Sequence, residues 1–168
     1  MPYSDHQLDS KDLTARCAIV TLSDTRTPDT DTSGQRIRSL LESANHSILH
    51  YHLIADDPQT LRSLLGDLLS RTDIDAIITN GGTAISRRDT TIEAVQSLLT
   101  QPLPGFGELF RMLSYQEIGS GALLSRALAG VASGKLLFSL PGSTNAVHLA
   151  MTKLILPELK HLLHELKK

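Results

Sequence analysis

The sequence lacks the features on which two common protein classes depend. Its 168 residues include a single cysteine, Cys17, so no intramolecular disulfide can form and a disulfide-stabilised secreted fold is excluded. No uninterrupted apolar stretch approaches the roughly 18 residues that a membrane helix needs. The N-terminus is polar rather than basic and then apolar, which is not the pattern of a signal peptide. We therefore expect a cytoplasmic protein without a membrane partner.

An excess of charge of either sign is also missing. The chain has 16 Lys and Arg residues against 18 Asp and Glu residues, and its formal net charge is -2 at pH 7. It has neither a basic stripe nor a polybasic tail, so we expect no nucleic-acid partner. A chain of this length buries about 68 to 70% of its unfolded surface, enough for one core but not for two. We expect a flexible tail over residues 1–14 and a single domain over residues 15–168.

Short apolar runs alternate with helical patterns along the first half of the chain. The runs predict three strands, at residues 15–23, 48–54 and 76–79. Thr32 and Gln35 have capping-box spacing, which predicts the start of a first helix. Asp57 before Pro58 predicts the cap of a second helix. This order indicates an α/β fold of three layers, with an open, mostly parallel sheet covered by helices on both faces.

The segment after the third strand predicts more helices. Thr90 and Glu93 form another capping box, so we expect a helix from about Thr91. Two short helices are expected at residues 108–115 and 122–126, separated by glycines.

The last part of the chain predicts two more strands and a long helix. The strands are expected at residues 128–132 and 136–140, with a tight turn at residues 133–134. The last helix is expected to begin near Ser143, and Pro157 should kink or restart it.

Ligands bind such sheets beyond the carboxyl ends of the strands. The residues in those positions are Ser23 and Asp24 after the first strand, Asp56 after the second, Gly81, Gly82 and Thr83 after the third, and Pro141, Gly142 and Ser143 after the last. Small, acidic and hydroxyl side chains therefore gather at one edge of the predicted sheet. That edge is the candidate site.

The double glycine after the third strand suits a phosphate loop. Gly81 and Gly82 let the backbone approach a ligand and expose N–H groups, and Arg87 and Arg88 could neutralise phosphate charge. The segment matches neither the P-loop nor the dinucleotide-binding pattern. Taken alone, a double glycine is more often an ordinary tight turn.

Two carboxylates at this edge have no structural role in the sequence pattern. Asp57 is a better helix cap than Asp56, and the capping box at Thr90 makes a cap at Asp89 unnecessary. Asp56 and Asp89 therefore form a candidate magnesium or positioning pair. Ser143 fits either a plain N-cap or an anion site. Two histidine pairs, His50 with His52 and His161 with His164, lack a third ligand nearby in the sequence, so zinc is not expected.

Several of these segments together resemble the MoaB/Mog family of molybdenum-cofactor biosynthesis proteins, whose relatives include the G domain of gephyrin. The resemblance covers residues 15–166 and is closer to the MoaB branch. The motifs that carry it are TLSDTRTPDTDTSG, LIADD, TNGGTAISRRDTTIEAV, PGFGELFRMLS, LLSRALAG and LPGSTNAV. It implies the molybdopterin-binding, Mog-like fold.

The resemblance also implies a reaction: adenylylation of molybdopterin by Mg-ATP, with release of pyrophosphate. Mg²⁺ would be the cofactor, and ATP and molybdopterin the substrates. On this basis the functional aspartates are Asp56 and Asp89, the phosphate loop is Gly81, Gly82 and Thr83, the pterin-side serine is Ser125, and the nucleotide-side turn is Pro141, Gly142 and Ser143. Family members form trimers, or hexamers built from trimers, so a homo-oligomer is expected.

One residue departs from the family pattern. Ala84 replaces the last glycine of GGTG, and if that position needs a positive φ, alanine costs about 1 to 2 kcal/mol there. This departure leaves open a protein of the MoaB branch that binds or carries molybdopterin without modifying it. A third alternative is a nucleotide-binding α/β domain unrelated to pterin.

Overall fold

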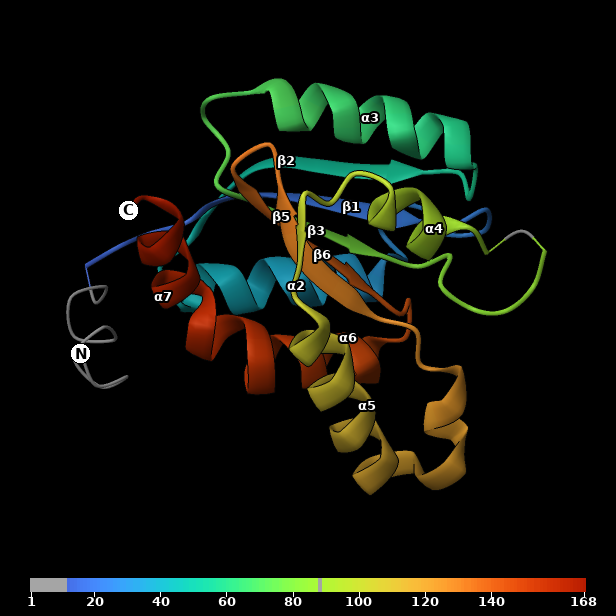
Figure 1. Cartoon of the computed structure of the whole chain (residues 1–168). Coiled ribbons are helices and arrows are strands. Elements are labelled where there is room, and N and C mark those ends of the chain that lie inside the picture. The colour runs from blue at the N-terminus through green and yellow to red at the C-terminus, as the bar shows by residue number, and fades with distance from the viewer. Residues whose placement is uncertain (1–11, 88) are drawn as a thin grey trace.

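Six strands form one sheet at the centre of the computed structural model, which describes residues 12–87 and 89–168 (Figure 1). Their order across the sheet is β2-β1-β3-β6-β5-β4. Strands β2, β1, β3 and β6 run parallel, β5 is antiparallel to β6, and β4 is antiparallel to β5. The strands are β1 (Arg16–Leu22), β2 (Ser47–Ile54), β3 (Ala76–Asn80), β4 (Gln101–Pro102), β5 (Leu128–Ala132) and β6 (Lys135–Leu140).

Helices cover both faces of this sheet, so the predicted three-layer α/β fold is confirmed. Helices α3 and α4 lie on one face, and α2, α5, α6 and α7 on the other (Figure 1). The helices are α2 (Thr32–Ser43), α3 (Pro58–Ser70), α4 (Thr91–Gln96), α5 (Pro104–Ile118), the 3₁₀ helix η1 (Gly119–Leu124), α6 (Thr144–Ala150), the π-helical η2 (Met151–Ile155) and α7 (Leu156–Leu166).

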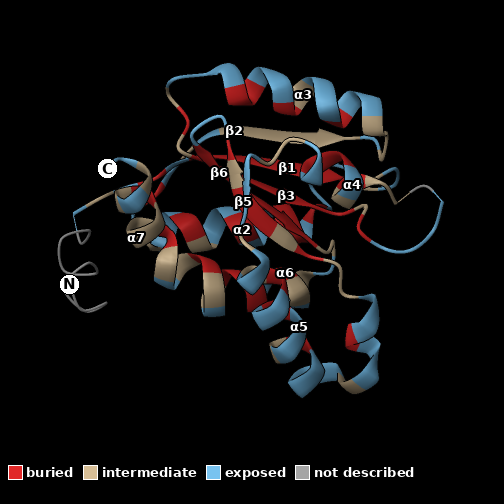
Figure 2. Cartoon of the chain, viewed as in Figure 1, coloured by how far each residue is buried: buried red, intermediate tan, exposed pale blue. Residues whose placement is uncertain are grey.

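The central strands are apolar on both sides because two separate cores enclose them (Figure 2). In β1, Ile19 packs toward α2 while Val20 packs toward α3. In β3, Ile78 packs in the same core as Ile19, and Ile77 packs in the same core as Val20. Strands buried on both faces read as continuous apolar runs, which is why the sequence showed them clearly.

Neither predicted capping box forms, although Thr90 does occupy the N-cap position of α4. Helix α2 is capped by Asp31, whose carboxylate accepts from the Gly34 N–H at 3.0 Å, rather than by Thr32, which bonds to the Thr144 hydroxyl at 2.9 Å. Helix α4 starts at Thr91 as predicted, but Thr90 makes no side-chain cap bond. The predicted cap Asp57 is confirmed. Capping-box spacing is a local signal, and it fails where one of the side chains bonds instead to a residue distant in the sequence.

The two short helices predicted at residues 108–115 and 122–126 are also wrong. Helix α5 runs unbroken from Pro104, since proline suits a first helical turn, and η1 occupies residues 119–124. Gly107 is required inside α5, because a Cβ there would lie 2.8 Å from the Ala127 carbonyl oxygen. Strand β4 was not predicted.

The end of the chain follows the prediction more closely. The turn between β5 and β6 holds Ser133 and Gly134 at positive φ, as a tight turn requires. Helix α6 begins after Ser143. The π-helical segment η2 separates it from α7, which begins at the residue before Pro157. Within the described part of the chain, no helix is long and apolar enough to cross a membrane. Residues 1–11 of the predicted tail lie outside the described residues.

Candidate functional site

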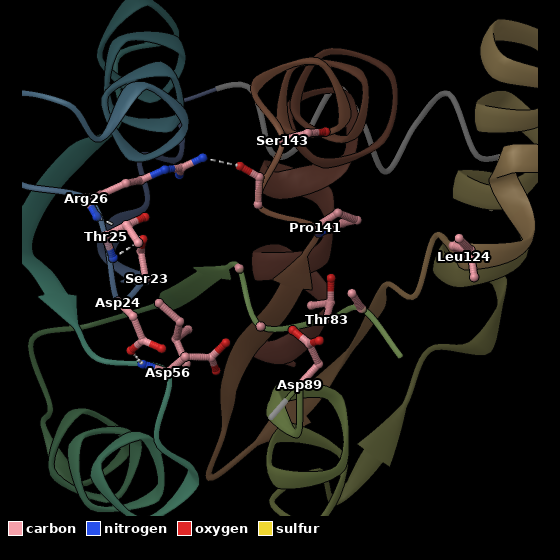
Figure 3. A pocket seen from close by; sticks show the side chains of 15 residues that line it. Ser23, Asp24, Thr25, Arg26, Asp56, Thr83, Asp89, Leu124, Pro141 and Ser143 are labelled. Atoms are coloured by element: carbon pink, nitrogen blue, oxygen red, sulfur yellow. Dashed lines mark hydrogen bonds between the residues drawn. The ribbon is translucent and has the colours of Figure 1, made fainter. Parts of the chain in front are cut away.

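The carboxyl ends of four parallel strands surround a pocket of about 460 Å³ (Figure 3). The segments that follow β1, β2, β3 and β6 supply most of its lining. The lining residues are Leu22, Ser23, Asp24, Thr25, Arg26, Asp56, Gly81, Gly82, Thr83, Ala84, Asp89, Leu124, Pro141, Gly142 and Ser143. The structure thus brings together nine of the residues selected from the strand ends, and adds Asp89.

Glycine is required at the centre of this pocket. Gly81 and Gly82 have φ values of 100° and 64°, in the region that favours glycine. A Cβ on Gly82 would lie 2.6 Å from Oδ1 of Asp56 and would overlap the Thr91 hydroxyl, and a Cβ on Gly142 would lie 3.1 Å from the Gly81 Cα. The three glycines therefore let two loops and a carboxylate pack at one point.

Asp56 lies beside two other carboxylates. Its backbone N–H donates to Oδ1 of Asp24 at 2.9 Å. Burial, then the nearby charges of Asp89 and Asp24, raise the pKa of the Asp56 carboxyl group. Asp57 accepts from the Thr60 N–H at 2.7 Å and caps α3, which leaves the Asp56 side chain facing the pocket, as the sequence indicated.

Asp89 is not the cap of α4, since Thr90 holds that position. Its carboxylate accepts hydrogen bonds from the backbone N–H of Ser86, at 3.1 Å, and from the Ser86 hydroxyl. These bonds orient Asp89 within its own loop while it lines the pocket (Figure 3). The two candidate acids therefore do share one cavity.

The carboxylates that line the pocket are the side chains that could bind a metal ion there. Among the described residues, no three His, Cys, Asp or Glu side chains converge in a way that could enclose an ion. Mg²⁺ usually binds proteins through only one or two carboxylates and completes its shell with water and substrate phosphates. Burial raises the pKa of Asp56 most, and the neighbouring charges of Asp89 and Asp24, which a cation would offset, raise it further. The residues fit Mg²⁺ shared with a phosphate ligand, rather than a metal cage made by the protein.

A second pocket, of about 260 Å³, adjoins the first. Leu124, Pro141 and Ser143 line both. Ser125 lies in the second pocket and not in the first, so the structure separates it from the glycine loop. Ser143 caps α6, accepting from the Ala146 N–H at 3.2 Å, and it also borders both pockets. The two cavities are therefore distinct but share part of their lining.

Arg87 was selected from the sequence to neutralise phosphate charge, but the structure does not bring it into the pocket. Arg87 is exposed and does not line either pocket, because the loop that carries it turns outward to solvent. Arg88 lies outside the described residues. Among the residues that the structure describes, the cation that lines the larger pocket is Arg26, which was missed although it stands two residues after Asp24 in the first motif.

A further arginine, Arg126, was also missed. Its guanidinium donates to the carbonyl oxygens of Thr83, Ala84 and Asp89 at 2.8, 2.6 and 2.9 Å, and pairs with Glu93 at 2.6 Å. It therefore holds the loop that carries the glycines and Asp89. Glu93 is used in this contact instead of in a capping box, and only the tertiary structure brings the two residues together.

The backbone conformation at Ala84, where the family pattern has glycine, does not require glycine. Among the described residues, only Asn45 and Ser133 have a positive φ without being glycine, so Ala84 is not in the left-handed region. The conditional cost of alanine at this position therefore does not arise. The Ala84 carbonyl accepts from Arg126, a contact that needs no particular side chain.

Comparison with known proteins identifies the family. Residues 18–161 match the family described as "Probable molybdopterin binding domain". The chain belongs to the MoaB/Mog family. It is 54% identical, over 92% of both chains, to molybdenum cofactor biosynthesis protein B of Halalkalibacterium halodurans, and 52% identical over the full length of the Staphylococcus carnosus protein of the same name.

Solved structures agree with this family assignment. A crystal structure of molybdenum cofactor biosynthesis protein B superposes with a TM-score of 0.90 at 51% identity, covering 92% of this chain and 97% of that one. The tungsten cofactor synthesizing protein MoaB from Pyrococcus furiosus gives a TM-score of 0.83 at 34% identity, covering 92% and 98%. The predicted Mog-like fold is therefore confirmed, and the chain is a molybdenum cofactor biosynthesis protein of the MoaB type.

Proposed function

We propose that the protein is a molybdopterin adenylyltransferase that uses Mg-ATP. The observation that supports this most is the arrangement of the pocket: a glycine loop, a turn after β6 and three carboxylates border a cavity that shares part of its lining with a second one. The first cavity would take the nucleotide phosphates, and the second, which contains Ser125, would take the pterin.

The reaction forms one bond and breaks one. An oxygen of the terminal phosphate of molybdopterin attacks the α-phosphorus of ATP, and the bond from that phosphorus to the bridging oxygen of the β-phosphate breaks. Pyrophosphate leaves with the electron pair. A phosphate monoester has a second pKa near 6, so the attacking group is largely ionised at neutral pH and needs no strong base. The protein has instead to position two anions and reduce their repulsion.

The residues of the pocket can do both. The N–H of Gly81 already donates to the Leu140 carbonyl at 3.0 Å, so the phosphate donors of this loop would be those of Gly82 and Thr83. Asp56 and Asp89, with Asp24 beside them, would hold Mg²⁺, which neutralises phosphate charge when bound.

The direct test is incubation of the protein with molybdopterin, ATP and MgCl₂. Formation of a pterin adenylate together with pyrophosphate is the expected result. Asp89→Ala should abolish turnover and leave pterin binding largely intact, because the second pocket does not include that residue. No product from a folded wild-type protein would reject the enzymatic proposal.

A second candidate is a MoaB-branch protein that binds or carries molybdopterin without adenylylating it. The observation in its favour is that the Asp89 carboxylate already accepts two hydrogen bonds from Ser86. Pterin binding with no ATP-dependent product would support this candidate. ATP binding with no pterin affinity would instead support a general nucleotide-binding domain.

We also propose a homo-oligomer, either a trimer or a hexamer. Large apolar side chains are exposed along α5 and η1, which project from the body of the molecule (Figure 2): Leu109, Met112, Tyr115, Ile118, Leu123 and Leu124. Exposed apolar surface of this kind marks a contact site. Leu123 is 84% exposed, so Leu123→Glu should leave the folded monomer intact and lower the mass measured by light scattering. An unchanged mass would show that this surface takes no part in the assembly of the oligomer.

A further inference from the structure

Arg26 is the only lysine or arginine among the described residues that line the larger pocket. The same lining contains three carboxylates, those of Asp24, Asp56 and Asp89. A bare polyphosphate would be repelled by such a surface unless cations met it. Figure 3 shows the Arg26 side chain reaching toward the segment that carries Pro141 and Ser143, while Asp56 and Asp89 lie lower in the view.

The Arg26 guanidinium is held in place by buried groups. Its Nη2 donates to the Gly142 carbonyl at 2.8 Å, and its Nη1 donates to the Ser33 hydroxyl and lies 3.4 Å from Oδ1 of Asp31. Asp31 and Ser33 are fully buried, and Ser33 in turn donates to Oδ1 of Asn80 at 2.7 Å. The side chain of Arg26 remains 27% exposed. It is therefore oriented by the protein and still accessible.

The anionic partner of Arg26 is itself fixed. Asp31 accepts from the Tyr51 hydroxyl and from the Gly34 N–H. Burial works against ionisation of Asp31, but hydrogen bonds from Tyr51, Thr21 and Gly34 and the charge of Arg26 outweigh it, so the pKa of this carboxyl lies below its ordinary value. The carboxylate is charged at neutral pH and keeps the guanidinium from turning away.

These contacts come from Nη1 and Nη2 and use at most three of the five guanidinium N–H donors. The remaining donors belong to a planar group that matches the geometry of phosphate oxygens. We propose that Arg26 binds a phosphate oxygen of the nucleotide in this pocket, as a ligand-contacting residue that complements the glycine loop. The proposal depends on the proposed function only for the identity of the ligand.

The experiment measures binding by calorimetry without pterin. The probes are Mg-ATP, AMP, pyrophosphate with MgCl₂, and adenosine. Arg26→Gln is compared with wild type and with Arg36→Gln, a matched loss of charge at an exposed position outside the pocket. We expect Arg26→Gln to weaken Mg-ATP binding by about tenfold or more, as for a lost hydrogen bond between charged groups, with adenosine unaffected. Arg36→Gln should bind like wild type.

The phosphate compounds then locate the contact. Loss confined to Mg-ATP and pyrophosphate assigns Arg26 to the β- or γ-phosphate, and an equal loss with AMP assigns it to the α-phosphate. Unchanged affinity for all probes would overturn the proposal, and so would an equal loss for adenosine, because Arg26 would then only brace the Gly142 turn. If Arg26→Gln does not fold, Arg26→Lys retains the charge without the planar donors, and the same comparison with adenosine applies to it.

Failure of this proposal can be told apart from failure of the proposed reaction. Wild-type protein that makes no pterin adenylate while Arg26→Gln loses Mg-ATP affinity would reject the reaction and retain Arg26. Product formation with unchanged Mg-ATP affinity in the variant would do the opposite. A wild-type protein that binds none of the phosphate compounds would reject both.

Discussion

Gly82 lies against Asp56: a Cβ placed on Gly82 would be 2.6 Å from Oδ1 of that carboxylate. The absence of a side chain at one position thus determines how closely the loop after β3 approaches the segment after β2. Since Gly82 also has a φ of 64°, both space and backbone conformation select glycine.

Replacement of Gly82 by alanine should therefore impair the site. We expect Gly82→Ala to destabilise the fold by about 1 to 2 kcal/mol through its φ alone, and to reduce turnover strongly because Asp56 must move. Urea unfolding and the adenylylation assay measure the two effects. Gly66→Ala is the control: nothing lies within 4 Å of its Cβ position, and the change should stabilise α3 by about 0.5 to 1 kcal/mol. Full activity in Gly82→Ala would contradict the packing argument.

Arg126→Ala should loosen the loop that carries Asp89. The change removes three hydrogen bonds to loop carbonyls, and misplacement of a positioned group by about 1 Å can cost roughly 10²-fold in rate. We expect a loss of that order in kcat/KM and faster hydrogen exchange at residues 83–87. Arg62→Ala, at an exposed position of α3, is the control. Unchanged exchange in the loop would show that Arg126 does not hold it.

Asp56→Asn should stabilise the protein at neutral pH while abolishing activity. Burial, Asp89 and Asp24 raise the pKa of Asp56 in the folded state, so the folded protein holds this proton more tightly than the unfolded chain does. That contribution to stability is present below the unfolded pKa and is lost as pH rises through the folded pKa. The stability difference between Asp56→Asn and wild type should therefore grow from acidic to neutral pH. Thermal unfolding across pH 4 to 8 tests this, and a constant difference would contradict it.

Ala84→Gly should not increase activity. Ala84 is outside the positive-φ region, so glycine relieves no strain there and only adds freedom to the unfolded chain. We expect turnover equal to or below that of the wild type, with a loss of about 0.5 to 1 kcal/mol in stability. Steady-state kinetics and urea unfolding check both. A clear rise in turnover would mean that the loop adopts a different backbone when substrate binds.

Much of the fold could be predicted from the sequence because its signals are local. Strands such as β1 and β3 are buried on both faces and appear as unbroken apolar runs. Asp57 before Pro58 specifies a helix start through the steric restriction that proline imposes and through the cap bond of the Asp57 carboxylate. The clustering of Ser23, Asp56 and Gly82 at one edge followed from the parallel order of the strands, because each carboxyl end then faces the same way.

What the sequence could not show depended on contacts between distant residues. Arg26 and Arg126 resemble any other arginine until folding brings Arg26 to the Gly142 carbonyl and Arg126 to the carbonyls of Thr83, Ala84 and Asp89. Arg87, two residues before Asp89 in its motif, proved to be exposed. A long arginine side chain can reach in many directions, and neighbours in the sequence do not determine which one it takes.

The sequence by itself determined the layered α/β architecture, the edge of the sheet where polar residues collect, and the resemblance to the MoaB/Mog family, since these depend on periodicity, backbone restriction and motif. Only the tertiary structure showed which arginine side chain lines the pocket, that Ser125 borders a separate cavity, and that Ala84 is unstrained. Those outcomes depend on side-chain reach and on backbone angles, which are set by packing between segments far apart in the chain.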